Sequence, residues 1–191
     1  MEIVQYPHPA LTWKAKPITE INARLRTTVE QMFELMYTSK GLGLAANQVA
    51  LPFQVFVVNP TGDPEEKDQE FVFINPEITS RKGSVEGEEG CLSLPDVYGE
   101  VRRAEQIVVE AYDLSGQGFE LNLTELPARV VQHEADHLQG VMFLERMTEA
   151  ALRELQPQLE LFESHYRSQQ AQGKIPDASQ LLREWRELEP Q

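Results

Sequence analysis

The sequence has no long apolar run. A membrane-spanning helix needs roughly 18 to 20 consecutive apolar residues, and no apolar run in the 191 residues approaches this length. The first residues, "MEIVQYPHPAL", also lack the basic start and apolar core of a secretory signal and the Arg/Ser-rich composition of a transit peptide. These absences predict a cytoplasmic protein with no membrane partner.

Positive charge is scarce as well. The chain has 17 Lys and Arg against 31 Asp and Glu, which gives a formal net charge of −14 at pH 7. Proteins that bind the phosphate backbone of nucleic acids need a basic surface, so the composition argues against such a partner. Residues 150–191 have five basic and seven acidic residues, and we therefore expect no direct nucleic-acid binding by this tail. The sequence leaves the oligomeric state open, with a monomer favoured.

Cysteine and histidine are the rarest of the reactive residue types. Cys91 is the only cysteine, which excludes a disulfide within the chain. A lone cysteine in such a protein is more often a small buried apolar group than a reactive one. Of the four histidines, His133 and His137 lie four residues apart in the segment "VVQHEADHLQG".

That segment is predicted to be part of a buried helix that starts after an N-cap at Thr124 and ends near Gly140, because its apolar residues lie on more than one side. Residues four apart share a helix face, so His133 and His137 can bind one metal ion. Glu134, about 100° round the helix, could act as a general base on a water molecule. The alternative is a structural histidine pair that is hydrogen-bonded in the core.

A catalytic metal site needs a third protein ligand and an open position. Six residues after His137, where one class of HExxH enzymes has another histidine, this chain has a phenylalanine. Two downstream glutamates, Glu160 and Glu163, lie in an amphipathic tail. Upstream, Cys91 follows Gly90 in "EEGCLSLP", and its thiolate would complete a Cys-His-His site.

The remaining patterns predict an α+β fold. Residues 1–18 are expected to form an extended, packed arm, and a helix is expected from an N-cap at Thr19 to a stop at Gly41. The segments "FQVFVVNP" and "FVFINP" are predicted to be strands that end at Asn-Pro. A hairpin is predicted in "IVVEAYDLSGQGFELNL", with the turn at Ser115-Gly116.

The C-terminal part has a helical pattern with a kink or restart at Pro157, a linker in "QQAQGKIPDASQ" and a short terminal helix in "LLREWRELEPQ". We expect residues 1–150 to form the catalytic domain. Residues 151–191 are expected to be a helical extension packed on the same domain.

Three segments together resemble the motifs of peptide deformylase. The segment "GLGLAANQ" (41–48) would by itself indicate a helix C-cap and a packed loop with an exposed glutamine. It is followed, in the family's order, by "EGCLS" (89–93) and "HEADH" (133–137), and "YPHPAL" also resembles the family's opening. The resemblance covers residues 3–147. It implies mixed and antiparallel strands around a central HExxH helix, with an N-terminal helix and a C-terminal helical tail.

The resemblance also implies a function. Such an enzyme is a metal-dependent hydrolase that removes the formyl group from N-formylmethionyl peptides and nascent chains at the ribosome, releasing formate. The expected cofactor is one divalent metal ion, usually Fe(II), with Zn, Ni or Co able to replace it. The residues implied are Cys91, His133 and His137 as metal ligands, Glu134 as base, Gln48 and the Leu92 N–H as oxyanion donors, Gly43 and Gly90 for the peptide backbone, and Leu42 and Val130 for the methionine pocket.

Two other readings remain. A zinc endopeptidase would use the same helix and base on a different substrate, and a non-catalytic binder of peptide N-termini would hold a structural metal. Asp136 is expected either to pair with an arginine such as Arg103 or to be a solvated helix carboxylate.

Overall fold

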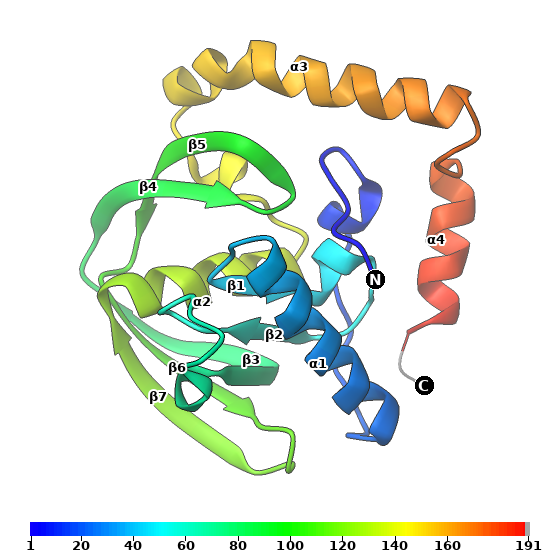
Figure 1. Ribbon diagram of the computed structural model, residues 1–191. Coiled ribbons are helices and arrows are strands. Elements are labelled where there is room, and N and C mark those ends of the chain that lie inside the picture. Colours follow the sequence, from blue (N-terminus) through cyan, green and yellow to red (C-terminus); the bar gives the residue numbers. More distant parts are fainter. Residues whose placement is uncertain (190–191) are drawn as a thin grey trace.

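The structure, a computed structural model, describes residues 1–189. Its strands form a five-stranded antiparallel sheet in the order β1-β2-β3-β6-β7 and a separate antiparallel pair, β4-β5 (Figure 1). The strands are β1 (Gly43–Ala45), β2 (Val55–Val58), β3 (Phe71–Lys82), β4 (Val85–Cys91), β5 (Leu94–Arg103), β6 (Gln106–Tyr112) and β7 (Gly118–Thr124). The α-helices are α1 (Ala23–Thr38), α2 (Glu125–Leu138), α3 (Glu149–Ala171) and α4 (Ala178–Glu187), and four 3-10 helices are η1 (Pro9–Thr12), η2 (Ala46–Val49), η3 (Lys67–Gln69) and η4 (Phe143–Arg146). The predicted α+β class is confirmed.

Helix α2 lies in the middle of the molecule, between the large sheet and the β4-β5 hairpin (Figure 1). Val131 and Leu138 on one side pack into a core with Phe56 and Phe73 of the sheet. The hairpin packs its own core against η4 and α3. Burial on two sides explains why the apolar residues of α2 do not form a single stripe, and the prediction of a buried helix is confirmed. Thr124 occupies the N-cap position, but its side chain makes no capping hydrogen bond.

The predicted start of the first helix at Thr19 is wrong. Helix α1 begins at Ala23 because the side chain of Asn22 accepts a hydrogen bond from the Leu25 N–H at 3.0 Å, which satisfies a free donor of the first turn. At the other end the helix stops at Thr38, before Gly41, and Lys40 takes a left-handed conformation with φ of 58°. The N-terminal arm is extended only in part, because it contains η1.

The prediction that the second strand ends at Asn-Pro is also wrong. Strand β3 continues through Asn75 and Pro76 to Lys82, with an irregularity in its pairing to β6 at this point. Asn75 adopts a positive φ of 50°, and its side chain exchanges two hydrogen bonds with the backbone of Ile18 at 2.7 and 2.8 Å. Proline cannot donate a hydrogen bond within a sheet, so the strand can continue through Pro76 only at an irregularity such as this one.

The two hairpins differ in how well the sequence predicted them. Strands β6 and β7 pair as expected, with the turn between Asp113 and Gln117. The β4-β5 hairpin was not predicted. Its strands contain three glycines and many charged residues, so they lack the alternation of apolar and polar residues that identifies a half-buried strand.

The tail folds back over the body. Helix α3 runs through Pro157 without a restart and crosses above the hairpin, and α4 descends beside the N-terminal arm (Figure 1). The break between them is shorter than the predicted linker, since α3 ends at Ala171 and α4 begins at Ala178. Trp185 of α4 is buried and packs on Trp13 with ring centroids 5.2 Å apart. The predicted terminal helix is present, although residues 190–191 of that segment lie outside the described part of the chain. Between residues 1 and 189, no helix has the length and apolar character needed to cross a membrane.

Candidate active site

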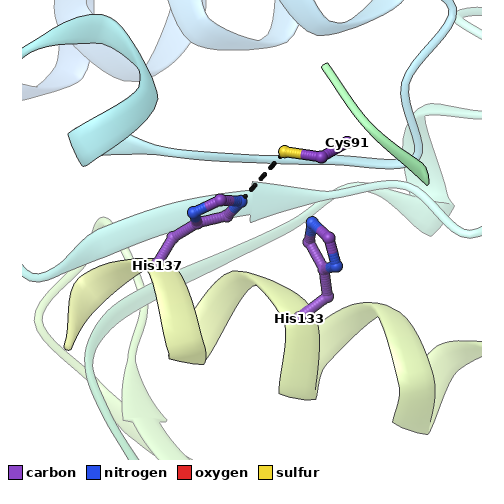
Figure 2. Close-up of side chains that lie close together, drawn as sticks. All are labelled: Cys91, His133 and His137. Atoms are coloured by element: carbon purple, nitrogen blue, oxygen red, sulfur yellow. Dashed lines mark hydrogen bonds between the residues drawn. The ribbon is translucent and has the colours of Figure 1, made fainter. Parts of the chain in front are cut away.

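Three metal-ligating side chains converge between α2 and the end of β4. His133 and His137 project from successive turns of α2 toward Cys91 (Figure 2). Their candidate ligand atoms all lie within 4.8 Å of one another, and the sulfur of Cys91 is 3.3 Å from Nε2 of His137. This is the one group of its kind that the described residues contain, and all three side chains are buried.

The electrostatics of this group fit a divalent cation. Burial, and then the charge of His133, lowers the pKa of His137 well below its ordinary value, which keeps this imidazole neutral as a ligand must be. Burial would also lower the pKa of His133, but Cys91 and Glu89 raise it to about 10. This imidazole therefore holds a proton between the sulfur and the carboxylate, and a metal ion that binds there would replace that proton. One sulfur and two imidazole nitrogens are a donor set that suits Zn, Fe, Co or Ni.

Glu89 orients one of the two histidines. Its Oε2 atom lies 3.0 Å from Nδ1 of His133, which leaves Nε2 for a metal. Arg103 donates two hydrogen bonds of 2.9 Å to the same carboxylate. Burial would raise the pKa of Glu89, but the hydrogen bonds from His133 and Arg103 outweigh it and hold that pKa well below the usual range. Glu89 is therefore a buried anion.

Glu134 lies beside the ligands and has an unused oxygen. Its side chain is 4% exposed, and within the described chain Oε2 has no hydrogen-bond partner. Burial raises its pKa to about 7, which is the range that suits a general acid–base group. Gly43 packs directly on it, because a Cβ at that position would lie 2.6 Å from Glu134 Oε1. A glycine is needed there to leave room for the carboxylate.

Gln48 is not the exposed loop residue that its segment alone would indicate, because it is only 1% exposed. Its Oε1 accepts a hydrogen bond from the Ala45 N–H at 2.8 Å, and this contact fixes the orientation of the amide. The NH₂ group therefore faces the site, with Nε2 at 3.4 Å from both the Cys91 sulfur and the Ser93 hydroxyl. Gln48 is thus a donor aimed beside the metal ligands.

These groups line the wall of a cavity of about 690 Å³. Strand β1 is an edge of the large sheet and β4 is an edge of the two-stranded hairpin, and residues of both line the cavity, so both can pair with an extended chain that enters it. Leu126 and Tyr98, which are 48% and 57% exposed, lie at its rim. Of the ten site residues predicted from the sequence, all except the fully buried His137 line the cavity: Leu42, Gly43, Gln48, Gly90, Cys91, Leu92, Val130, His133 and Glu134.

The predicted pairing of Asp136 is confirmed. Arg103 donates a short hydrogen bond to the Asp136 carboxylate, and Arg146 donates two more. Two residues were missed. Glu89 could have been suspected from its place two residues before Cys91, but nothing local indicates that it is buried. Arg129 gives no local signal, since a helix arginine is usually solvated.

A cysteine at the end of a strand, together with two imidazoles and a carboxylate on a buried HExxH helix, defines a class of metal-dependent hydrolases. A model of the polypeptide deformylase family matches residues 1–153, and the chain belongs to this family. It is 43% identical to a peptide deformylase of Rhodopirellula baltica over 189 aligned residues, and the alignment covers 99% of this chain and 94% of that protein. A peptide deformylase of Acidobacterium capsulatum is 47% identical, over 76% of this chain and 85% of its own.

Solved structures agree with this assignment. A mutant of peptide deformylase 1B from Arabidopsis thaliana superimposes with a TM-score of 0.86 at 41% identity, covering 93% of this chain and 96% of that one. The peptide deformylase of Thermus thermophilus gives a TM-score of 0.78 at 42% identity, over 85% and 97% of the two chains. The protein is therefore an enzyme of the peptide deformylase family.

Proposed function

We propose that this protein removes the formyl group from the N-terminal methionine of nascent polypeptides and releases formate. The observation that supports this most is the cluster around Glu134, where residues of three distant motifs meet: Gln48, Cys91 and the two histidines. The residues expected to hold the metal are Cys91, His133 and His137. Once bound, a divalent ion supplies Lewis-acid chemistry, which activates water and polarises the formyl carbonyl.

Glu134 is the proposed proton carrier. It takes a proton from the attacking water, whose oxygen forms a bond to the formyl carbon. The C–N bond then breaks, Glu134 gives the proton to the departing amine, and the products are formate and a free N-terminal methionine. A pKa of about 7 lets this carboxyl group both accept and donate a proton near neutral pH.

Two donors are proposed to stabilise the negative charge on the formyl oxygen. The Gln48 NH₂ group is fixed by Ala45, so it does not need to reorganise during the reaction. The second donor is the backbone N–H of Leu92, which lies in the turn after Cys91.

The substrate is proposed to bind as an added strand between β1 and β4. Gly43 and Gly90 would offer backbone groups to the peptide, while Leu42 and Val130 would line the pocket for the methionine side chain. Placing the peptide between two edges would fix the formyl group beside Glu134.

The cellular setting follows from this reaction as further proposals. We expect Fe(II) as the native metal, action on nascent chains at the ribosome, a cytoplasmic location and a monomer. We also propose residues 1–150 as the catalytic domain and 151–191 as an extension on the same body, although residues 190–191 lie outside the described structure.

The decisive experiment offers the anaerobically purified, metal-loaded protein two peptides. Formyl-Met-Ala-Ser should release formate at a rate that saturates with substrate, whereas an unformylated peptide with internal cleavage sites should stay intact. Internal cleavage without formate would instead identify an endopeptidase. Binding of the formyl peptide with no turnover would support the non-catalytic binder.

A further inference from the structure

One contact network ties α2 to the β4-β5 hairpin beside the metal ligands. Arg129 of α2 reaches across to the hairpin, and its side chain is 14% exposed. It donates to the backbone carbonyls of Gly87, Val85 and Val101 at 3.3, 3.1 and 3.0 Å. A further bond of 2.8 Å goes to Oε1 of Glu89. One guanidinium therefore holds both strands of the hairpin and the carboxylate that orients His133.

This arrangement matters because the metal ligands belong to different elements. The two histidines lie on α2, whereas Cys91 ends β4. The sulfur can reach the imidazoles only if the hairpin is docked on the helix in the correct position. Arg129 joins the hairpin and the helix, so its loss would remove four of the hydrogen bonds that hold the hairpin carrying Cys91 against α2.

Charge gives Arg129 a second role. Arg103 is shared between Glu89 and Asp136, so it neutralises neither carboxylate alone. Arg129 supplies the second cation to Glu89. Without it, the buried Glu89 carboxylate would keep His133 and an arginine that it shares with Asp136. Removing one partner of a buried charge is strongly destabilising.

We propose that Arg129 is a positioning residue, which docks the Cys91 strand on α2 and fixes Glu89 against His133. It acts through these residues and not through the substrate. The proposal concerns the assembly of the metal site, so it can be tested without relying on the proposed reaction.

The test is a Co(II) titration of the metal-free protein against a competing chelator, followed by the thiolate-to-cobalt absorption band. We expect Arg129→Met to weaken Co(II) binding by about 10- to 100-fold, as for other groups that orient metal ligands. Arg129→Lys keeps the charge but cannot donate hydrogen bonds to several acceptors at once as a guanidinium does. Its Co(II) affinity should therefore lie between those of the wild type and Arg129→Met. A purely structural role would lower the melting temperature and leave the Co(II) affinity of the folded protein unchanged.

Two further variants sharpen the result. Gly87→Ala places a Cβ 2.9 Å from the Arg129 guanidinium, so it should displace the side chain and weaken Co(II) binding while Arg129 itself is intact. It also carries the test if Arg129→Met does not fold. Arg102→Met is the matched control, because Arg102 lies on the same hairpin but pairs with Glu86 in solvent. Its Co(II) affinity should equal that of the wild type.

Kinetics separate positioning from substrate contact. With formyl-Met-Ala-Ser, Arg129→Met should lower kcat and leave KM within about twofold. Wild-type Co(II) affinity in the folded Arg129 and Gly87 variants would overturn the proposal. If KM for the formyl peptide were also raised in Arg129→Met, Arg129 would instead be assigned to substrate binding. If the wild type released no formate, the proposed function would fail while the cobalt comparison would still decide the role of Arg129.

Discussion

Glu134 can be replaced without rebuilding its surroundings, since Gln has the same shape and Oε2 has no hydrogen-bond partner among the described residues. Glu134→Gln removes the proton carrier and should lower kcat by about 10²- to 10⁴-fold. Metal content should stay at the wild-type level, as measured by elemental analysis. Glu160→Gln, an exposed change on α3, is the control and should have wild-type activity. Full activity of Glu134→Gln would mean that another group moves the proton.

His8 gives the stability of the protein a pH dependence. It is buried, its Nδ1 accepts a hydrogen bond from the Ala10 N–H, and burial lowers its pKa from 6.5 to about 4. The unfolded chain therefore binds a proton that the folded protein excludes. The stability from this group is fully present above pH 6.5 and is lost progressively as the pH falls to about 4.

His8→Asn keeps an acceptor for Ala10 but does not titrate. The loss of unfolding free energy between pH 7 and pH 4 should be smaller in this variant, by at most about 3 kcal/mol. Urea unfolding at several pH values measures this difference directly. Parallel pH profiles for the two proteins would show that His8 has no part in acid sensitivity.

At the scale of elements, α4 is a test of whether the tail stabilises the body. Trp185 is 4% exposed and packs on Trp13 next to η1. Trp185→Ala should reduce the free energy of unfolding by about 3 to 5 kcal/mol, through lost burial and the cavity left behind. Leu161→Ala, at a position that is 71% exposed on α3, should change it by less than about 0.5 kcal/mol. If urea unfolding showed that Trp185→Ala changes the free energy of unfolding as little as Leu161→Ala does, α4 would not contribute to the stability of the fold.

The elements also show where sequence patterns succeed. Helix α2 was predicted because its periodicity and its HExxH segment are local features. The β4-β5 hairpin was missed because its strands are stabilised by contacts that are distant in sequence, such as the bonds from Arg129 to Val85 and Val101. The passage of β3 through Pro76 was missed for the same reason, since Ile18 satisfies Asn75 from 57 residues away.

For the whole molecule, the metal is expected to join two separately packed parts, since α2 belongs to the core of the large sheet and Cys91 to that of the hairpin. Removing the metal with a chelator should lower the melting temperature, and adding Ni(II), Zn(II) or Co(II) should restore it. At a free metal concentration of 100 times Kd, the stabilisation is about 2.7 kcal/mol. Cys91→Ala lacks one ligand and should show a much smaller shift. A melting temperature that does not depend on metal would contradict this link.

The sequence by itself determined the chemistry of this protein. The spacing of two histidines on one helix, a glutamate between them and a single cysteine after a glycine limited the site to a few kinds of metal centre, because residue type and helical spacing are local properties. Only the tertiary structure decided that Cys91 reaches those histidines, that Glu89 is buried against one of them, and that Arg129 and Arg103 surround it. The contacts from Cys91 to His137 and from Glu89 to His133 and Arg129 join positions some 40 residues apart or more, and they depend on how the hairpin docks on α2, which no local pattern specifies.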